Sequence, residues 1–315
     1  MPYNEQPMSA NPKETVSRIG YIRTSPRRWP AHGWVGLALV AVFWPLNWLA
    51  PGQRTLWAFF PLWLGFILTV DGLVVLRKQT SLFTRSRGKF AGLFLISVFC
   101  WWLFEILNGR AHNWQYLGTG HLGLSAYLIL SSINFSIVIP AVFEASELAS
   151  TFPFIRKARP GLVIRGDRLT TLAFFVVGWV MLALLLAWPK YFFPFLWLSL
   201  FFIQEPINIW LGHRALADWT GKADWKPVYS LWIGVLMTGF FWEMWNFFAW
   251  PKWVYSVPGV DFLHIFEMPL LGYGGYIPFA MELYAFYHLV VGLLGDKQTS
   301  YIELDPGSGE EKKQV

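Results

Sequence analysis

The chain has 315 residues, of which 55% are hydrophobic, 19% are aromatic and only 14% are charged. This composition excludes an ordinary soluble domain and indicates an integral membrane protein. The net charge of +6 is explained by basic loops beside anionic lipid, so no nucleic-acid partner is expected. The single cysteine, Cys100, excludes an internal disulfide and a metal–thiolate cluster.

Eight apolar stretches reach the length of about 20 residues that a helix needs to cross a bilayer. In chain order they are 33–50, 55–76, 90–107, 123–148, 169–187, 191–211, 229–249 and 274–295. Because they are continuously apolar rather than alternating, the expected fold class is an all-α, polytopic membrane protein. The fourth stretch is too long for one upright helix, so we expect an interfacial or re-entrant piece first and a span from about Asn134 on.

Lysine and arginine mark the sides of the membrane, because cytoplasmic loops carry an excess of both. With a cytoplasmic N-terminus, all but four of the 25 basic residues fall on the cytoplasmic side; the exceptions are Arg54, Arg110, Lys190 and Lys252. We therefore expect a multi-pass protein of the inner or plasma membrane with both termini in the cytoplasm. The expected regions are an N-terminal tail (1–30), a first membrane repeat (31–155), a basic linker (156–168), a second repeat (169–296) and a disordered tail (297–315).

The two repeats are expected because a shift of 138 residues, with one residue inserted midway, superimposes a short pattern on itself. The first copy has Glu105, Asn108, Trp114 and Tyr116, and the second has Glu243, Asn246, Trp253 and Tyr255. Further on, IPAVFE at 139–144 matches IPFAME at 277–282. The shared order predicts a duplication into two parallel four-helix repeats, related by an axis along the membrane normal, with sites at their interface.

Carboxylates within the expected spans are the main functional signal: Asp71, Glu105, Glu144, Glu147, Glu205, Glu243 and Glu282. A charge at the bilayer centre costs about 2.5 to 3.5 kcal/mol, so these side chains are expected to face the interior, pair or hold a proton. Few cations lie in the spans, and His288 is the only clear histidine there. In Glu-x-x-Asn, however, the amide shares a helix face with the carboxyl and is its nearest partner.

Depth along the spans predicts that Glu243 meets Glu282 and, by the repeat, that Glu105 meets Glu144. Paired carboxyls in a dry pocket suit proton transfer, because their pKa values separate. The predicted catalytic residues are Glu243, Glu282, Glu105, Glu144, Asn246 and Asn108, and the predicted substrate-binding residues are Trp253, Tyr255, Trp114, Tyr116, Asp71 and Glu205. The apolar loop 250–273 is expected to fold over the bundle as a lid. No HExxH, CxxC or phosphate loop occurs, so neither a metal nor a cofactor is expected.

The segment WNFFAWPKWVY at 245–255, followed by a proline and a glutamate in the next span, resembles the small membrane lycopene cyclases of the heterodimeric or fused type. The resemblance implies repeated helical units and cofactor-light protonation of polyene hydrocarbons. It matches Glu243, Asn246, Trp253 and Tyr255 to one part of the family pattern, and Pro278 and Glu282 to the other. This chain departs from that pattern with Pro-x-x-x-Glu in place of Pro-x-Glu-Glu and with four expected spans per half rather than three.

Three functions fit these patterns. The first is an intramembrane enzyme that uses carboxylic acids for proton transfer on an apolar isoprenoid or lipid, with membrane lipid and the apolar substrate as its partners. The second is a proton- or cation-coupled transporter or channel, which requires an aqueous path between the acids. The third is a structural assembly protein whose acids only bridge helices. The abundant aromatic residues and the scarcity of glycine-broken spans favour the enzyme.

Overall fold

The computed structural model describes residues 28–305, so the expectations for most of the N-terminal tail and for residues 306–315 lie outside it. The fold is mostly helical, and seven helical segments are long and apolar enough to cross a membrane. The longer helices are α1 (Ala31–Leu49), α2 (Thr55–Lys78), α4 (Arg87–Ala111), α5 (Leu124–Phe135), α6 (Val138–Ser150), α8 (Arg168–Ala187), α10 (Ser199–Leu211), α12 (Lys226–Phe247) and α13 (Tyr276–Leu293). The chain is a multi-pass membrane protein by helix length and hydropathy.

Short elements connect these helices. They are α3 (Leu82–Arg85), α7 (Pro153–Arg156), α9 (Pro189–Phe192), α11 (Ala217–Thr220), and the 3₁₀ helices η1 (Phe193–Trp197) and η2 (Leu270–Gly275). Four short strands form two antiparallel pairs: β1 (Trp114–Leu117) with β2 (Lys252–Tyr255), and β3 (His264–Ile265) with β4 (Met268–Pro269). In the first pair Trp114 lies opposite Tyr255, and Tyr116 lies opposite Trp253.

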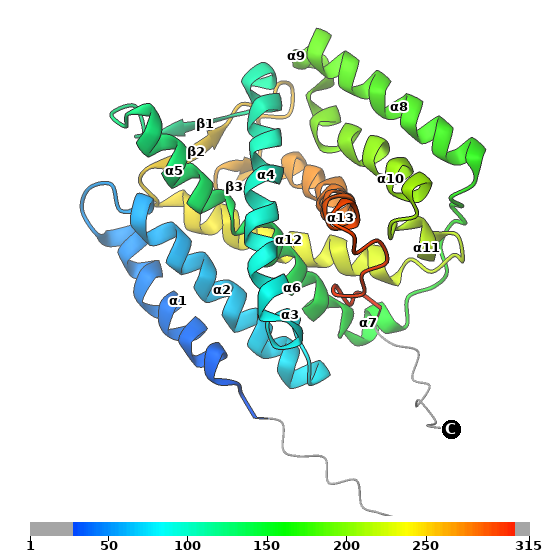
Figure 1. The fold of residues 1–315 in the computed structure, drawn as a ribbon. Coiled ribbons are helices and arrows are strands. Elements are labelled where there is room, and N and C mark those ends of the chain that lie inside the picture. Colours follow the sequence, from blue (N-terminus) through cyan, green and yellow to red (C-terminus); the bar gives the residue numbers. More distant parts are fainter. Residues whose placement is uncertain (1–27, 306–315) are drawn as a thin grey trace, which may run out of the picture.

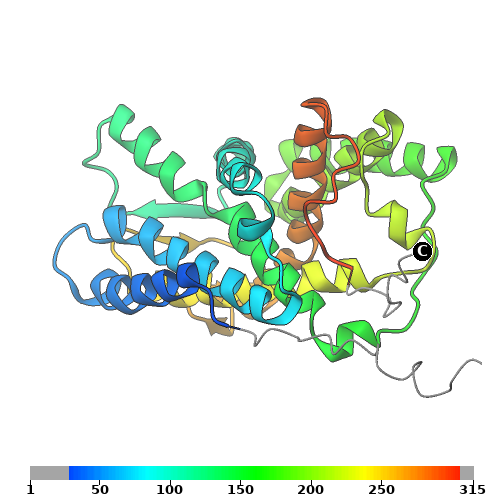
Figure 2. The same ribbon diagram turned by 60° about the horizontal axis from the view of Figure 1, so that its bottom comes forward.

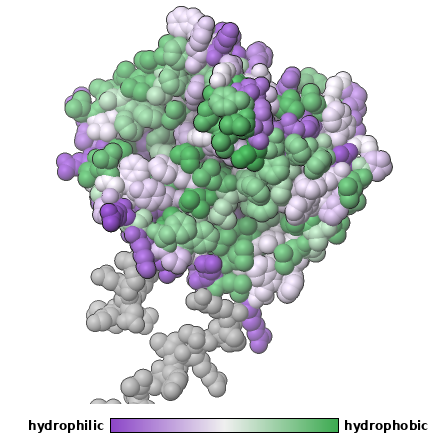
Figure 3. Space-filling model, turned by 180° about the vertical axis from the view of Figure 1, so that it is seen from behind, coloured by the Kyte–Doolittle hydropathy of each residue, from purple (hydrophilic) through white to green (hydrophobic). Residues whose placement is uncertain are grey.

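The α1–α2 pair and the α8–α10 pair lie on opposite sides of the molecule, with α4, α6, α12 and α13 between them (Figure 1). The second view shows α13 standing steeply to α12 (Figure 2). The packing is similar on the two sides, because α2 packs against α6 as α10 packs against α13. A broad apolar surface covers the rear face, as expected for contact with lipid (Figure 3).

Helix α12 differs from the expectation of an eighth apolar span at 229–249. A helix of 22 residues is present, but it is not among the seven segments apolar enough to cross a membrane. It approaches α6 closely at Gly234, where a Cβ would lie 2.3 Å from Ser146 Oγ. Since this close packing hides α12 inside the protein, its sequence does not have to match lipid.

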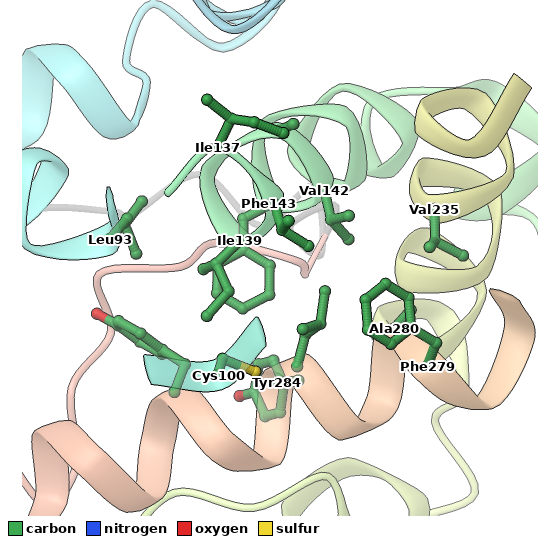
Figure 4. Close-up of a cluster of buried hydrophobic side chains, with 14 of the residues drawn as sticks. Leu93, Cys100, Ile137, Ile139, Val142, Phe143, Val235, Phe279, Ala280 and Tyr284 are labelled. Atoms are coloured by element: carbon green, nitrogen blue, oxygen red, sulfur yellow. The ribbon is translucent and has the colours of Figure 1, made fainter. Parts of the chain in front are cut away.

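The fourth predicted span divides into two helices, as expected, but α6 has only 13 residues, so the predicted span from about Asn134 is too short to cross a membrane by itself. Ser136 and Ile137 form the turn between α5 and α6. Every residue of α6 is buried, whereas Phe135 is the only buried residue of α5. Figure 4 shows α6 side chains such as Phe143 packing near Ala280 of α13 and Val235 of α12. Helix α6 is therefore the centre of the core, and α5 lies at its edge.

Residues 297–305 differ from the expected disordered tail. They form a segment without regular structure, here named the C-terminal strap, which packs into the bundle with Tyr301, Ile302 and Leu304 buried. The Tyr301 hydroxyl donates to the Leu82 carbonyl at 2.7 Å, and Ser230 Oγ donates to the Leu304 carbonyl at 3.4 Å. The strap therefore ties the end of the chain to α3 and α12.

Candidate functional site

A pocket of about 370 Å³ lies beside the β1–β2 pair and is here named the aromatic cavity. Its walls come from the start of α2, from α4, β1, α5, η1 and α12, from β2 and the loop after it, and from the start of α13. Nine rings with polar atoms line it: Trp101, Trp114, Tyr116, Tyr127, Trp197, Trp242, Trp253, Tyr255 and Tyr276. A largely apolar pocket with a few convergent polar groups is typical of a small-molecule site.

Glu105 lies behind one wall of this cavity and binds three of those rings through a single oxygen. Its Oε1 accepts from Trp101 Nε1 at 2.9 Å, from Trp114 Nε1 at 3.0 Å and from the Tyr116 hydroxyl at 2.6 Å. Trp101 reaches it because residues four apart share a helix face. The carboxyl is therefore solvated by aromatic donors in place of water.

Glu243 forms a second centre of the same kind on α12. Its Oε1 accepts from the Tyr255 hydroxyl at 2.7 Å and from the Tyr276 hydroxyl at 2.6 Å, and Trp253 Nε1 donates to the Tyr255 oxygen at 2.8 Å. Gly239, one turn before Glu243, makes room for Tyr276, since a Cβ there would lie 3.0 Å from the ring. Glu105 and Glu243 thus each accept a hydrogen bond from a tyrosine hydroxyl on the cavity wall.

The asparagine of each Glu-x-x-Asn pattern fixes the strand that follows its helix. Asn108 Nδ2 donates to the Trp114 carbonyl at 2.8 Å, and its Oδ1 accepts from the backbone N–H groups of Asn113 and Trp114. Asn246 makes the matching pair with the backbone of Trp253, at 2.8 and 3.0 Å. These asparagines hold β1 and β2 in place and do not line the cavity.

The two strand tyrosines remain protonated donors. Burial raises the pKa of the Tyr116 phenol well above its usual value, and the charge of Glu105 raises it further. The pKa of Tyr255 rises for the same reasons, first burial and then Glu243. Both hydroxyls therefore keep their protons near neutral pH and point them at the carboxyls.

The predicted carboxyl pairs are not formed. Both carboxyl oxygens of Glu282 are buried without a hydrogen-bond partner among residues 28–305, so Glu282 does not bond to Glu243. Glu144 lies in the field of Asp71, Glu147 and Arg85 rather than beside Glu105. Depth along a helix was the basis of the prediction, and depth does not fix which way a side chain points around the helix.

Asp71 and Glu205 do not line the cavity either, although substrate binding was predicted for both. Each accepts hydrogen bonds at the start of a short helix. Asp71 accepts from Ser81 Oγ at 2.8 Å and from the Phe83 N–H at 2.9 Å, and Glu205 accepts from the Ala217 N–H at 3.0 Å. His32 Nε2 also lies 2.7 Å from Asp71. These acids organise α3 and α11.

Glu147, the last of the seven acids, belongs to a charged cluster at the C-terminal strap. It pairs with Arg85, lies 3.7 Å from Lys78 Nζ and accepts the Glu303 backbone N–H at 2.9 Å. Arg85 Nε also donates to the Tyr301 carbonyl at 3.1 Å. This cluster, composed of Glu147, Arg85, Lys78 and the strap, is here named the strap cluster.

Sequence reasoning missed Trp101 and Tyr276. The signal for Trp101 was its position four residues before Glu105, on the same helix face. Tyr276 has no counterpart in the repeat pattern, since the residue 138 positions earlier is Val138. The predicted lid loop does contribute to the cavity wall, through Val257, Val260 and Met268.

Within residues 28–305 no group of three or more histidine, cysteine or acidic side chains could hold a metal ion. No protein-family model, curated protein or solved structure matches the chain.

Proposed function

We propose that this protein is an intramembrane enzyme that moves protons on an apolar isoprenoid or lipid bound in the aromatic cavity. The observation that supports it most is the pair of glutamates, Glu105 and Glu243, each hydrogen-bonded to a tyrosine on the wall of one apolar pocket. A general acid or base must lie within hydrogen-bond reach of the reacting proton, directly or through one relay group.

In this proposal the tyrosine is the relay. One phenol gives its proton to the substrate and takes the proton of the glutamic acid behind it. The other phenol accepts a substrate proton while passing its own to a glutamate. The net composition of the substrate is unchanged, so the reaction is an isomerisation or cyclisation that requires no cofactor. Asn108 and Asn246 serve as positioning residues, because they hold the strands that carry these tyrosines.

We also propose that the two centres descend from a duplication. The Glu–Tyr and Asn–backbone hydrogen bonds recur at positions related by the predicted shift. The β1–β2 register favours the same relation, since Trp114 faces Tyr255 while Tyr116 faces Trp253. Exchange of the two strands leaves that pattern unchanged, as a two-fold axis between them requires. The cytoplasmic position of both termini and the resemblance to lycopene cyclases stay predictions.

The test is an extract comparison. The chain is expressed in cells that accumulate acyclic carotenoids, beside a Glu105→Gln, Glu243→Gln double variant, and pigments and total lipids are separated and weighed by mass spectrometry. Loss of a general acid or base reduces a rate by about 10² to 10⁴-fold, so the double variant should form almost none of the wild-type product.

Glu303→Gln is the matched control, because it makes the same chemical change in the strap, away from the cavity. It should form the wild-type product in full. If wild type and both variants insert stably and give identical extracts, the enzyme proposal fails. Proton-coupled flux in liposomes would then test the transporter.

A further inference from the structure

We infer that the aromatic cavity binds the positively charged ammonium group of a lipid-like molecule. This inference rests on the proposed function for the choice of site and specifies the class of substrate. It comes from the direction of the hydrogen bonds that the wall rings donate and from the carboxyls of Glu105 and Glu243, which lie behind the wall.

Six of the nine wall rings with polar atoms already use those atoms in hydrogen bonds within the wall. The Trp101, Trp114 and Tyr116 donors reach Glu105, and the Tyr255 and Tyr276 hydroxyls reach Glu243. Neither glutamate lines the cavity, so these hydrogen bonds run from the rings into the wall and away from the ligand space. Apart from the phenol oxygens that the proposed proton relay uses, these six rings offer a ligand their aromatic faces, and an aromatic face carries negative charge density that attracts a cation.

The two carboxyls add to that field. Neither Glu105 nor Glu243 lies within 4.0 Å of a lysine, arginine or histidine nitrogen in the part of the chain that the structure describes. Each accepts all its observed hydrogen bonds on Oε1, from neutral donors. Lys252 lines the cavity, but its ammonium is paired with Glu267. A positive charge in the cavity would therefore meet two carboxyls that have no counter-ion.

Two amide side chains of the cavity wall also have an oxygen without a partner among the described residues. Asn113 and Asn134 both line the cavity, and the side-chain oxygen of each is buried without a hydrogen-bond partner among residues 28–305. Asn113 is only 4% exposed, so its oxygen depends on a ligand or water for a partner. The aromatic faces and the two carboxyls without a counter-ion favour a cation with an apolar chain over an anion.

The experiment uses three probes of one shape and length. They are hexyltrimethylammonium, the hydrocarbon in which carbon replaces its nitrogen, and hexanesulfonate. Binding to the full chain in maltoside micelles is followed by tryptophan fluorescence, after correction for probe taken up by empty micelles. A desolvated cation–π contact contributes up to about 2 kcal/mol, so the ammonium should bind at least about tenfold more tightly than the hydrocarbon. The sulfonate should not bind.

The double variant Glu105→Gln, Glu243→Gln should lower the ammonium-to-hydrocarbon affinity ratio several-fold while hydrocarbon binding is kept. Glu303→Gln makes the same chemical change away from the cavity and should retain the wild-type preference. Equal affinities of the wild-type protein for ammonium and hydrocarbon would overturn the inference without any variant, as would an unchanged ratio in a folded double variant.

The two proposals fail separately. An ammonium preference without any new product in the extracts contradicts the enzyme alone. A product made from an uncharged substrate, in a protein that shows no ammonium preference, contradicts this inference alone.

Discussion

The carboxyls at the aromatic cavity and in the strap cluster have opposite kinds of partners, neutral donors in the first and cations in the second. Helix α2 connects them: Thr55 at its start lines the cavity and Lys78 at its end joins the strap cluster, about 36 Å apart for 24 residues. At the cavity, Glu105 and Glu243 accept hydrogen bonds from neutral aromatic side chains. In the strap cluster, Glu147 faces two cations and a backbone N–H.

This difference distinguishes a carboxyl that only stabilises the fold from one that is available to a ligand. Glu147 is neutralised by side chains of the same chain, and its partners are fixed by the strap, so it contributes to the fold. Glu105 and Glu243 accept hydrogen bonds but have no cation beside them among the described residues, and the rings that donate to them line an open pocket. A carboxyl kept without a counter-ion beside a cavity is the usual condition for binding or proton transfer. The following predictions test this contrast.

The largest effect on stability is expected from Arg85→Met. Removal of one partner from a buried ion pair typically costs about 3–5 kcal/mol, because the other charge stays buried. Glu147 would keep only Lys78 at 3.7 Å and the Glu303 N–H. Thermal unfolding in maltoside measures this cost. The double variant Arg85→Met, Glu147→Met should recover most of it, whereas an Arg85→Met protein as stable as wild type would refute the structural role.

An intermediate loss of stability is expected when Asn108 or Asn246, which hold the strands of the cavity wall, is replaced. Asn108→Ala removes three hydrogen bonds and Asn246→Ala removes two, and buried groups left unpaired cost about 1–3 kcal/mol. Hydrogen exchange should show faster opening of β1 and β2 in each variant, with Asn108→Ala the more affected. Asn108→Asp keeps the acceptor oxygen and should lie between. Unchanged exchange in the strands would contradict the positioning role.

The smallest effect is expected from Asp296, just before the strap. Lys89 donates a hydrogen bond to Asp296 at 2.7 Å and holds the pKa of that carboxyl below its usual value. Its stabilisation is therefore complete above the unfolded pKa of about 3.9 and is lost as pH falls through the lower folded value. Both side chains are about half exposed, so the loss should be about 0.5 kcal/mol. Asp296→Asn should abolish this part of the acid dependence of the melting temperature; a slope equal to wild type would contradict it.

Local patterns in the sequence predicted more than long-range ones. Glu-x-x-Asn placed Glu105 and Asn108 on one helix face, and both contact β1. The predicted pairing of the amide with the carboxyl is wrong, because Glu105 bonds to aromatic donors and Asn108 bonds to the backbone of the strand. To predict whether Glu243 meets Glu282, one must know how each helix is turned about its own axis. Local residue spacing does not give that orientation. The strap was not predicted because the sequence around it is polar and charged, which is typical of a disordered tail. Its apolar anchors are Tyr301, Ile302 and Leu304.

The β1–β2 pair determines whether the backbone groups beside the cavity need water as a hydrogen-bond partner. Loops that leave a helix at membrane depth expose backbone N–H and C=O groups, and each group that lacks a partner draws water toward it. Here the two strands satisfy each other, and the asparagine amides of α4 and α12 satisfy the adjoining turns. One wall of the aromatic cavity is thereby built from non-helical chain that does not need water to pair its backbone groups, so a ligand can lie against this wall without bridging water.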